Sequence, residues 1–172
     1  MKKIGITLIL LSIITLTVTA NFSNNSNGVE YLRIHIRANS NDTIDQNVKY
    51  QVKNAIVDYL TPIVANCSSK EQTVLEINKN KTQIQNVANG VLKSAGFNYH
   101  SKVAVRNELF PTRVYGDFTL EEGFYDALIV ELGEAKGDNW WCVVYPPLCF
   151  TGTENIKYKS KILEIINSFK ND

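Results

Sequence analysis

The stretch Gly137–Phe150, GDNWWCVVYPPLCF, constrains the fold of this chain more than any other segment. It holds both tryptophans, two of the three cysteines and two of the four prolines of the 172-residue sequence. As a strand it places one tryptophan on each face, because successive side chains point to opposite sides. Both faces then need cover, which predicts a position inside a sheet. The strand must end at Pro146-Pro147, since proline donates no hydrogen bond to a neighbouring strand.

The first twenty residues have the layout of a secretory signal, with Lys2 and Lys3 before the apolar run 4–18 and Ala20 at a fair cleavage position. The apolar run is shorter than the roughly 20 residues that a membrane-spanning helix needs. A cleaved signal is therefore favoured over a retained anchor, and membrane contact is expected only through this segment before cleavage. Residues 21–28 are mostly Asn and Ser and predict a flexible tether.

Residues 29–170 are expected to form a single α+β domain, since a chain of this length can bury one ordinary core. Alternating apolar positions predict strands, and apolar positions at three- and four-residue steps predict helices. The expected strands are 29–38, a segment beginning near 97, 112–118, 124–132 and 139–145. The expected helices are 42–62, 68–96 with a break at 78–81, and 156–169. Together they predict a single mixed, mainly antiparallel sheet of about four or five strands with helices packed on it.

Residues 133–138, with a glycine near each end, are expected to connect strands 124–132 and 139–145 as a hairpin. In the first helix, Lys49 and Lys53 fall outside the apolar stripe. Both lysines are therefore expected to face solvent.

Charge and residue inventory exclude several classes of function. Beyond residue 20 the formal charge is −1, which argues against a nucleic-acid partner. The two histidines, His35 and His100, cannot build a three-histidine zinc site. Glycine-rich phosphate loops, Cys-x-x-Cys and Gly-x-Ser-x-Gly do not occur. The sequence therefore predicts no metal, no small-molecule cofactor and no catalytic residue.

The cysteines Cys67, Cys142 and Cys149 are an odd number and too few for a disulfide scaffold. One bridge with one spare thiol is the simplest interpretation. The segment between Cys142 and Cys149 contains two prolines and can fold back far enough to join their sulfurs. The alternative leaves both cysteines reduced and buried as small apolar side chains.

The expected strand 29–38 places Arg33, His35 and Arg37 on one face. The chain has 14 lysines and only 4 arginines, so two arginines around a histidine are unusual for its composition. Arginine offers a rigid fork of donors to carboxylates, phosphates and aromatic rings, and arginine and tryptophan dominate the binding energy of protein interfaces. The residues expected to bind a protein partner are Arg33, His35, Arg37, Asn39, Ser40 and Trp140.

A structural interpretation of the same residues stays open. Arg33 and Arg37 can instead pair with Asp126 or Glu131 across the sheet. The tryptophans can simply fill the core, given their large apolar area.

A secreted cell-envelope thiol enzyme or hydrolase is the alternative function. Cys142 or Cys149 would be the nucleophile, His35 the base, and Asn39 or Asp126 the group that orients the base. This mechanism requires an unpaired cysteine and neighbouring strands at 29–38 and 139–145. A cysteine between Trp141 and Val143 is more typical of a core position.

Four segments of the chain form a pattern typical of a known family. They are 32–41 (LRIHIRANSN), 110–116 (FPTRVYG), 123–128 (GFYDAL) and 137–150 (GDNWWCVVYPPLCF). The pattern resembles the stage II sporulation protein R family. The segments span most of the chain after the signal, and the last one is long and unusual in composition, so the match is specific.

The resemblance implies an exported signalling protein of endospore-forming bacteria. It implies secretion from the forespore into the space between the forespore and mother-cell membranes. The partner implied there is the outer face of a membrane-embedded aspartic protease, which converts the inactive precursor of sigma factor E into its active form. The resemblance carries over no catalytic residue, in keeping with an activator rather than an enzyme.

Overall fold

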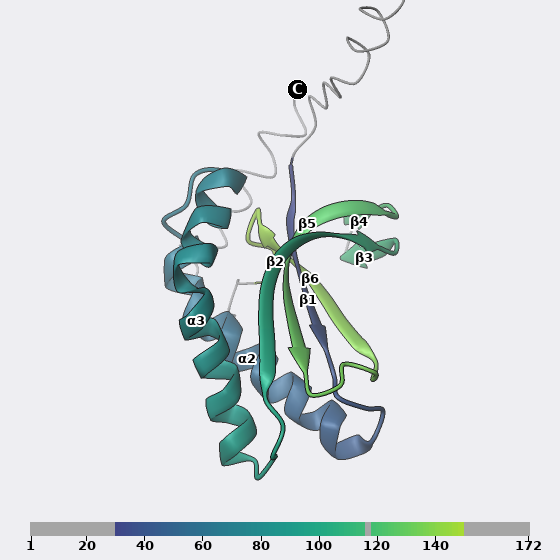
Figure 1. Ribbon diagram of the computed structural model, residues 1–172. Helices are drawn as coiled ribbons and strands as arrows, with labels where there is room; N and C mark the ends of the chain where they lie inside the picture. Colours follow the sequence, from purple (N-terminus) through teal and green to yellow (C-terminus); the bar gives the residue numbers. More distant parts are fainter. Residues whose placement is uncertain (1–29, 116–117, 150–172) are drawn as a thin grey trace, which may run out of the picture.

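Two long helices pack on one face of a four-stranded sheet in the computed structural model, which describes residues 30–115 and 118–149 (Figure 1). The sheet contains β1 (Leu32–Arg37), β2 (Ser101–Phe110), β5 (Gly123–Leu132) and β6 (Asn139–Tyr145), and the helices are α2 (Thr43–Val64) and α3 (Lys70–Ser94). The predicted α+β class is confirmed. The signal segment, the tether and the expected helix 156–169 lie outside the described residues.

The strands of the main sheet follow the order β2-β5-β1-β6. Strand β1 runs parallel to β5 and antiparallel to β6, while β2 and β5 are antiparallel. The sheet is therefore mixed and mainly antiparallel, as predicted. The single short strand expected at 112–118 is instead a hairpin, in which β3 (Arg113–Tyr115) pairs with β4 (Phe118–Leu120) as a second, two-stranded sheet.

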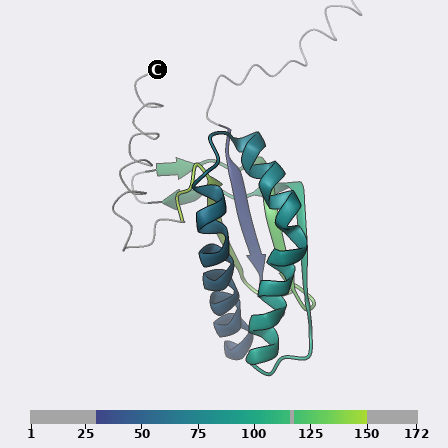
Figure 2. The same ribbon diagram turned by 90° about the vertical axis from the view of Figure 1, so that its left-hand side faces the viewer.

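The main core lies between the sheet and the two helices, which cover the same face (Figure 2). From β1 it takes Leu32, Ile34 and Ile36, all fully buried. Burying one such side chain stabilises a fold by about 1.5–3 kcal/mol. The opposite face of β1 carries the polar side chains and is not covered by a helix among the described residues. The alternation of apolar and polar residues in β1 thus gives the sheet a core face under the helices and a second face, called here the open face, which carries Arg33, His35 and Arg37.

Helix α3 begins and ends where the sequence predicts. The Ser69 hydroxyl accepts a hydrogen bond from the Gln72 amide at 3.2 Å, and Gly96 follows the last turn with φ +83°. The predicted break at 78–81 is wrong, because the helix is continuous. The Asn80 amide donates to the Glu76 carbonyl at 2.8 Å and its oxygen accepts from the Tyr59 hydroxyl at 2.7 Å. Polar side chains that bond along or across the helices do not interrupt the helix.

The expected solvent position of Lys49 is also wrong. Lys49 in α2 is only 1% exposed. Its ammonium donates to the Gln46 side chain at 2.6 Å and to the Asp138 carbonyl at 3.0 Å. Burial lowers the pKa of Lys49, and the charge of Asp138 opposes this effect. The lysine joins the start of α2 to the segment before β6.

Residues 133–138 do not form the predicted hairpin, because β1 lies between β5 and β6. The connection instead crosses the end of β1. The Gly137 amide donates to the Ala38 carbonyl at 2.9 Å, and the Lys136 amide donates to the Asn39 carbonyl at 3.1 Å. A Cβ at Gly137 would overlap the carbonyl of Ser40, so only glycine fits this crossing.

Strand β6 therefore does not occupy the predicted interior position, since among the described strands it pairs only with β1. Its two tryptophans are half-buried on opposite faces, Trp140 against the helix-side core and Trp141 against the open face. The strand ends at Tyr145, directly before Pro146-Pro147, as predicted.

We expect Gly137→Ala to lower the free energy of unfolding by about 2 kcal/mol or more, because the new methyl group must push the backbone of Ser40 away from the connection. Urea unfolding of the full chain, followed by tryptophan fluorescence, measures the loss.

The matched control is Gly90→Ala. Gly90 lies in α3 with open space where a Cβ would be added, so the same substitution should stabilise by about 0.5–1 kcal/mol. Equal effects at the two positions would contradict the role given to Gly137.

Candidate functional site

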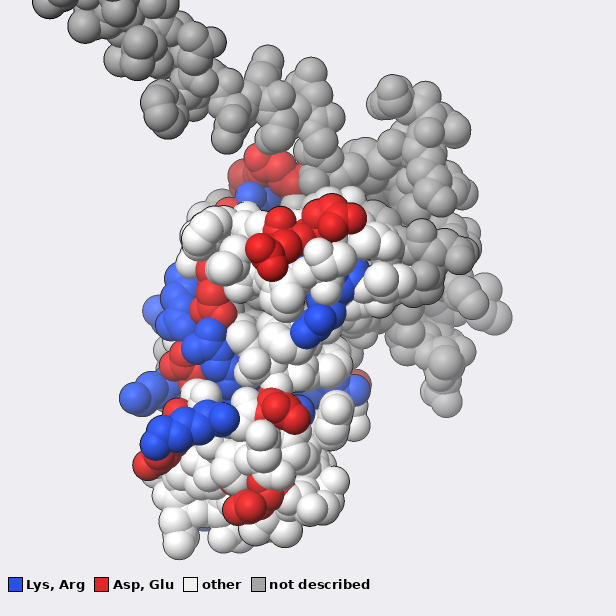
Figure 3. All heavy atoms as spheres, turned by 90° about the vertical axis from the view of Figure 1, so that its right-hand side faces the viewer, with Lys and Arg blue, Asp and Glu red and all other residues white. Residues whose placement is uncertain are grey.

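The open face of the sheet gathers Arg33, His35 and Arg37 from β1, since alternate residues of a strand share one face. On this face they are flanked by residues of β2, β5 and β6 and by the β3–β4 hairpin. Seen from the side opposite to the helices, basic and acidic side chains lie next to one another (Figure 3). This candidate site is a protein surface with a partly buried polar layer.

Arg33 is fully buried and lies against two aromatic rings. Its guanidinium carbon is 4.2 Å from the centre of the Phe110 ring and 4.8 Å from that of Tyr125. Its Nη2 donates to the Tyr115 hydroxyl at 3.0 Å. Cation–π contacts of this kind are strongest when the cation is removed from water.

The β3–β4 hairpin is held to the open face by two arginine contacts. Tyr115 of β3 accepts the hydrogen bond from Arg33. Arg113, at the start of β3, lies 4.0 Å from the centre of the Trp141 ring. Trp141 in turn stacks on the His35 ring, with centroids 5.2 Å apart.

His35 is 4% exposed and takes part in a charged network. Its Nδ1 lies 2.8 Å from Glu108 Oε1, and because a carboxylate only accepts, Nδ1 carries the proton. Glu108 also accepts from Arg37 and Arg106, and both arginines bond Glu131, at 3.1 Å and 2.8 Å. With His35 neutral, this network has two positive and two negative charges.

The buried position of His35 perturbs its titration. Burial lowers the pKa of His35, and the nearby charge of Arg37 acts in the same direction. The hydrogen bond to Glu108 opposes this lowering without cancelling it. For Glu108, burial alone would raise the pKa, but the bonds from His35 and Arg106 outweigh it and lower the pKa.

The segments that carry the family resemblance meet around Arg33. Segment 32–41 supplies Arg33 and His35, segment 110–116 supplies Phe110 and Tyr115, and segment 123–128 supplies Tyr125. Segment 137–150 supplies Trp141, which contacts both His35 and Arg113. Four separate stretches of sequence therefore build one site.

Asn39 and Ser40 lie away from this site, at the start of α2. The Asn39 amide and the Ser40 hydroxyl both donate to the buried Asp45 carboxylate, at 2.7 Å and 2.6 Å, and Tyr99 donates to it at 2.6 Å. Burial alone would raise the pKa of Asp45, but these hydrogen bonds outweigh it and lower the pKa. The Asn39 oxygen also accepts from the Glu134 amide at 2.9 Å. Both side chains hold the β1–α2 turn.

The residues predicted to bind a partner thus lie in three places. Arg33, His35 and Arg37 share the open face, whereas Asn39 and Ser40 lie beyond the end of β1, in the turn before α2. Trp140 faces the helices, where the Lys53 ammonium lies 5.7 Å from its ring centre. Arg37 pairs with Glu131, as the structural interpretation expected, while Arg33 pairs with neither acid among the described residues.

The thiol mechanism does not fit the structure. Cys142 is joined to Cys149 in a disulfide, with Cα atoms 6.2 Å apart. Although β1 and β6 are neighbours, Cys142 points into the helix-side core while His35 points to the open face. His35 therefore cannot act as a base for this sulfur.

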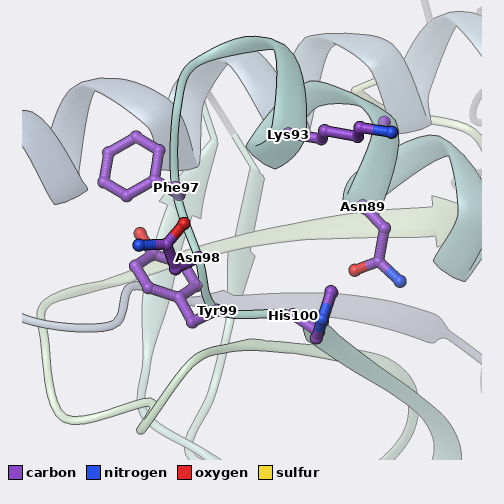
Figure 4. A pocket seen from close by; sticks show the side chains of 7 residues that line it. Asn89, Lys93, Phe97, Asn98, Tyr99 and His100 are labelled. Atoms are coloured by element: carbon purple, nitrogen blue, oxygen red, sulfur yellow. The ribbon is translucent and has the colours of Figure 1, made fainter.

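A shallow hollow of about 500 Å³ lies near the end of α3 (Figure 4). Its lining includes Asn89, Lys93, Phe97, Tyr99 and His100. Asn89 is committed to the fold, because its oxygen accepts from the Ser101 amide and hydroxyl at 2.7 Å and 2.8 Å. Among the described residues no cluster of His, Cys, Asp and Glu is arranged to hold a metal ion, and neither helix is long and apolar enough to span a membrane.

Sequence reasoning missed several residues of the open-face site. They include Arg106, Glu108, Phe110, Arg113, Tyr115 and Tyr125. All of these except Arg106 and Glu108 lie in segments 110–116 and 123–128, where the family resemblance was the only available signal.

The stability of the fold should fall on acidification through the ordinary His pKa of 6.5. The folded pKa of His35 is lowered, so the unfolded chain binds more protons in this window, and stability is fully present only above it. Urea midpoints measured between about pH 7.5 and 5.5 should decrease, and His35→Gln should flatten this dependence.

The control is His100→Gln at an exposed position, which should keep the wild-type pH dependence. Restricting the window to values above about pH 5.5 keeps the titration of the carboxylates, including Glu108, out of the comparison. An unchanged slope in His35→Gln would contradict the role assigned to His35.

Alkylation of the unreduced chain should label Cys67 alone, because Cys142 and Cys149 are joined. Peptide mass spectrometry before and after reduction identifies the labelled positions. Full labelling at 142 and 149 without reductant would contradict the bridge. Replacing both bridged cysteines by serine should cost about 2–3 kcal/mol of stability on the loop-entropy model.

Comparison with known proteins places this chain in a family. A family model described as Stage II sporulation protein R matches residues 29–155. The stage II sporulation protein R of Bacillus subtilis (strain 168) is 33% identical over 124 residues, or 72% of this chain. The chain spans about half of that curated relative, 55% of its length. No solved structure matches. The chain belongs to the stage II sporulation protein R family.

Proposed function

We propose that this chain is a secreted signalling protein of endospore formation that activates a membrane-embedded aspartic protease by direct contact. The protease then processes the precursor of sigma factor E. Family membership assigns the chain to sporulation. We propose further that the chain is secreted from the forespore into the space between the two membranes. Its partner there would be the outer face of the protease.

The observation that carries this proposal is that the four segments of the family resemblance converge on the sheet face that neither described helix covers. All four arginines of the chain lie on this face or at its rim. Arg33 lies against Phe110 and Tyr125, and Arg113 lies over Trp141. Arg37 and Arg106 pair with Glu108 and Glu131. Arginine and aromatic side chains are the residue types that dominate the energetics of protein interfaces. The face therefore has the composition of a contact surface.

Activation by contact sets an energetic requirement. A ligand shifts the conformation of its receptor only by the difference between its affinities for the two states. The open face must therefore bind the active arrangement of the protease more tightly than the inactive one. A charged network at the rim, such as Arg106 with Glu108 and Glu131, contributes orientation and on-rate more than affinity.

We expect Arg106→Glu to reduce precursor processing by about tenfold or more, because it reverses a charge at the rim of the proposed contact face. Arg106 is 42% exposed, so the protein level should stay normal. The measurement is co-expression of the full chain with the protease and the precursor, with processing and chain level scored together.

Lys79→Glu is the matched control. It makes the same charge change at a 68% exposed position of α3, on the other side of the molecule, and should leave processing unchanged. Equal losses in both variants, or no binding between the chain and the outer segment of the protease, would overturn the proposal.

A further inference from the structure

Arg33 is an unusual residue even within the open-face site. It has no exposed surface, and no carboxylate among the described residues pairs with it. Its Nε and Nη1 are buried without a hydrogen-bond partner. A buried charge without a counter-charge is costly, and buried donors are almost always satisfied. The described part of the chain therefore leaves the charge of Arg33 without a counter-charge.

The contacts that compensate the charge of Arg33 within residues 30–115 and 118–149 are weaker than an ion pair. The rings of Phe110 and Tyr125 supply cation–π contacts, and the Tyr115 hydroxyl is a neutral acceptor for Nη2. A carboxylate accepts from a guanidinium in two parallel, charge-assisted bonds, which are about twice as strong as neutral ones. An acidic group is therefore the better partner for this arginine.

The geometry of the guanidinium makes Tyr115 a competitor for such a group. A carboxylate that binds in two bonds uses either Nε with Nη2 or Nη1 with Nη2. Each arrangement uses a different one of the two N–H groups of Nη2. The Tyr115 hydroxyl accepts from one of them, so a carboxylate that binds in that arrangement has to displace it. The two nitrogens left without a partner, Nε and Nη1, are the second donors of these two arrangements.

We propose that Arg33 is a recognition site for a carboxylate side chain of the partner protein, and that the Tyr115 hydroxyl holds its place in the free chain. Binding of the acidic side chain releases Tyr115 and loosens the attachment of β3 to the open face. The identity of the partner rests on the function proposed above, whereas the carboxylate site itself does not.

Sodium acetate is the probe for the site. The full chain has only four arginines, so the Nε–Hε signal of Arg33 can be followed by NMR and assigned by its loss in Arg33→Lys. In Tyr115→Phe, which loses the competing hydroxyl, the Arg33 signal should reach half its shift at about three- to tenfold lower acetate than in the wild type. Sodium chloride at matched ionic strength should not reproduce the shift.

Tyr59→Phe is the matched control, because it removes a tyrosine hydroxyl that donates to Asn80 between the two helices. It should leave the acetate response of Arg33 unchanged. An Arg33 signal in Tyr115→Phe that does not respond to acetate, or responds more weakly than in the wild type, would overturn the inference. The decisive variant changes a single hydroxyl, and Arg33→Lys serves only to assign the signal.

A second measurement separates this inference from the proposed function. Binding to the outer segment of the protease should tighten in Tyr115→Phe by a similar factor. If acetate binds as expected and the protease does not, the proposed function fails and the carboxylate site stands. If the protease binds Tyr115→Phe and the wild type equally, Tyr115 does not compete with the partner and the inference fails.

Discussion

Strand β1 is the element on which the rest of the structure depends. It is hydrogen-bonded to β5 on one side and to β6 on the other, and it joins the parallel and antiparallel halves of the sheet. Its Leu32, Ile34 and Ile36 enter the core under the helices, while Arg33, His35 and Arg37 form the open face. Removing β1 would divide the sheet into a β2–β5 pair and a lone β6. One six-residue strand thus determines both the core and the candidate site.

The open face is polar, and two of its side chains are almost completely buried. His35 and Arg33 have almost no exposed surface, because aromatic rings from Phe110, Tyr125 and Trp141 cover them. A charge in such surroundings interacts strongly with any acid that reaches it, since the local dielectric is lower than in water. The face combines exposed charged residues at its rim with the buried positive charge of Arg33.

Much of the fold followed from periodicity, and two of the errors share one cause. The strands and helices were predicted near their observed positions because their apolar patterns are local. The hairpin expected at 133–138 was wrong because pairing is not local: β1, made about one hundred residues earlier, takes the place beside β5. Lys49 was misplaced for the same reason, since its partner, the Asp138 carbonyl, belongs to that distant connection.

The candidate site was predictable only in part. Strand alternation put Arg33, His35 and Arg37 on one face, but no pattern in the sequence indicated that Phe110, Tyr115 and Tyr125 surround Arg33. Those contacts depend on the register of β2 against β5 and on the position of the β3–β4 hairpin. Asn39 and Ser40 were predicted as contact residues because turn residues and binding residues have the same chemistry. Their hydrogen bonds to Asp45 can be recognised only once the position of the start of α2 is known.

The central position of β1 also governs the order of events during folding. Its first residue, Leu32, pairs with Asp126 in β5 and Tyr145 in β6, so both neighbours are synthesised long after β1 itself. Such contacts between distant parts of the chain make folding slow compared with a helical bundle of the same length. The two helices can form early, but the sheet cannot close until β6 has emerged. The core under the helices therefore stays incomplete until residues 139–145 have been synthesised, because Trp140, Cys142 and Val144 of β6 pack into it.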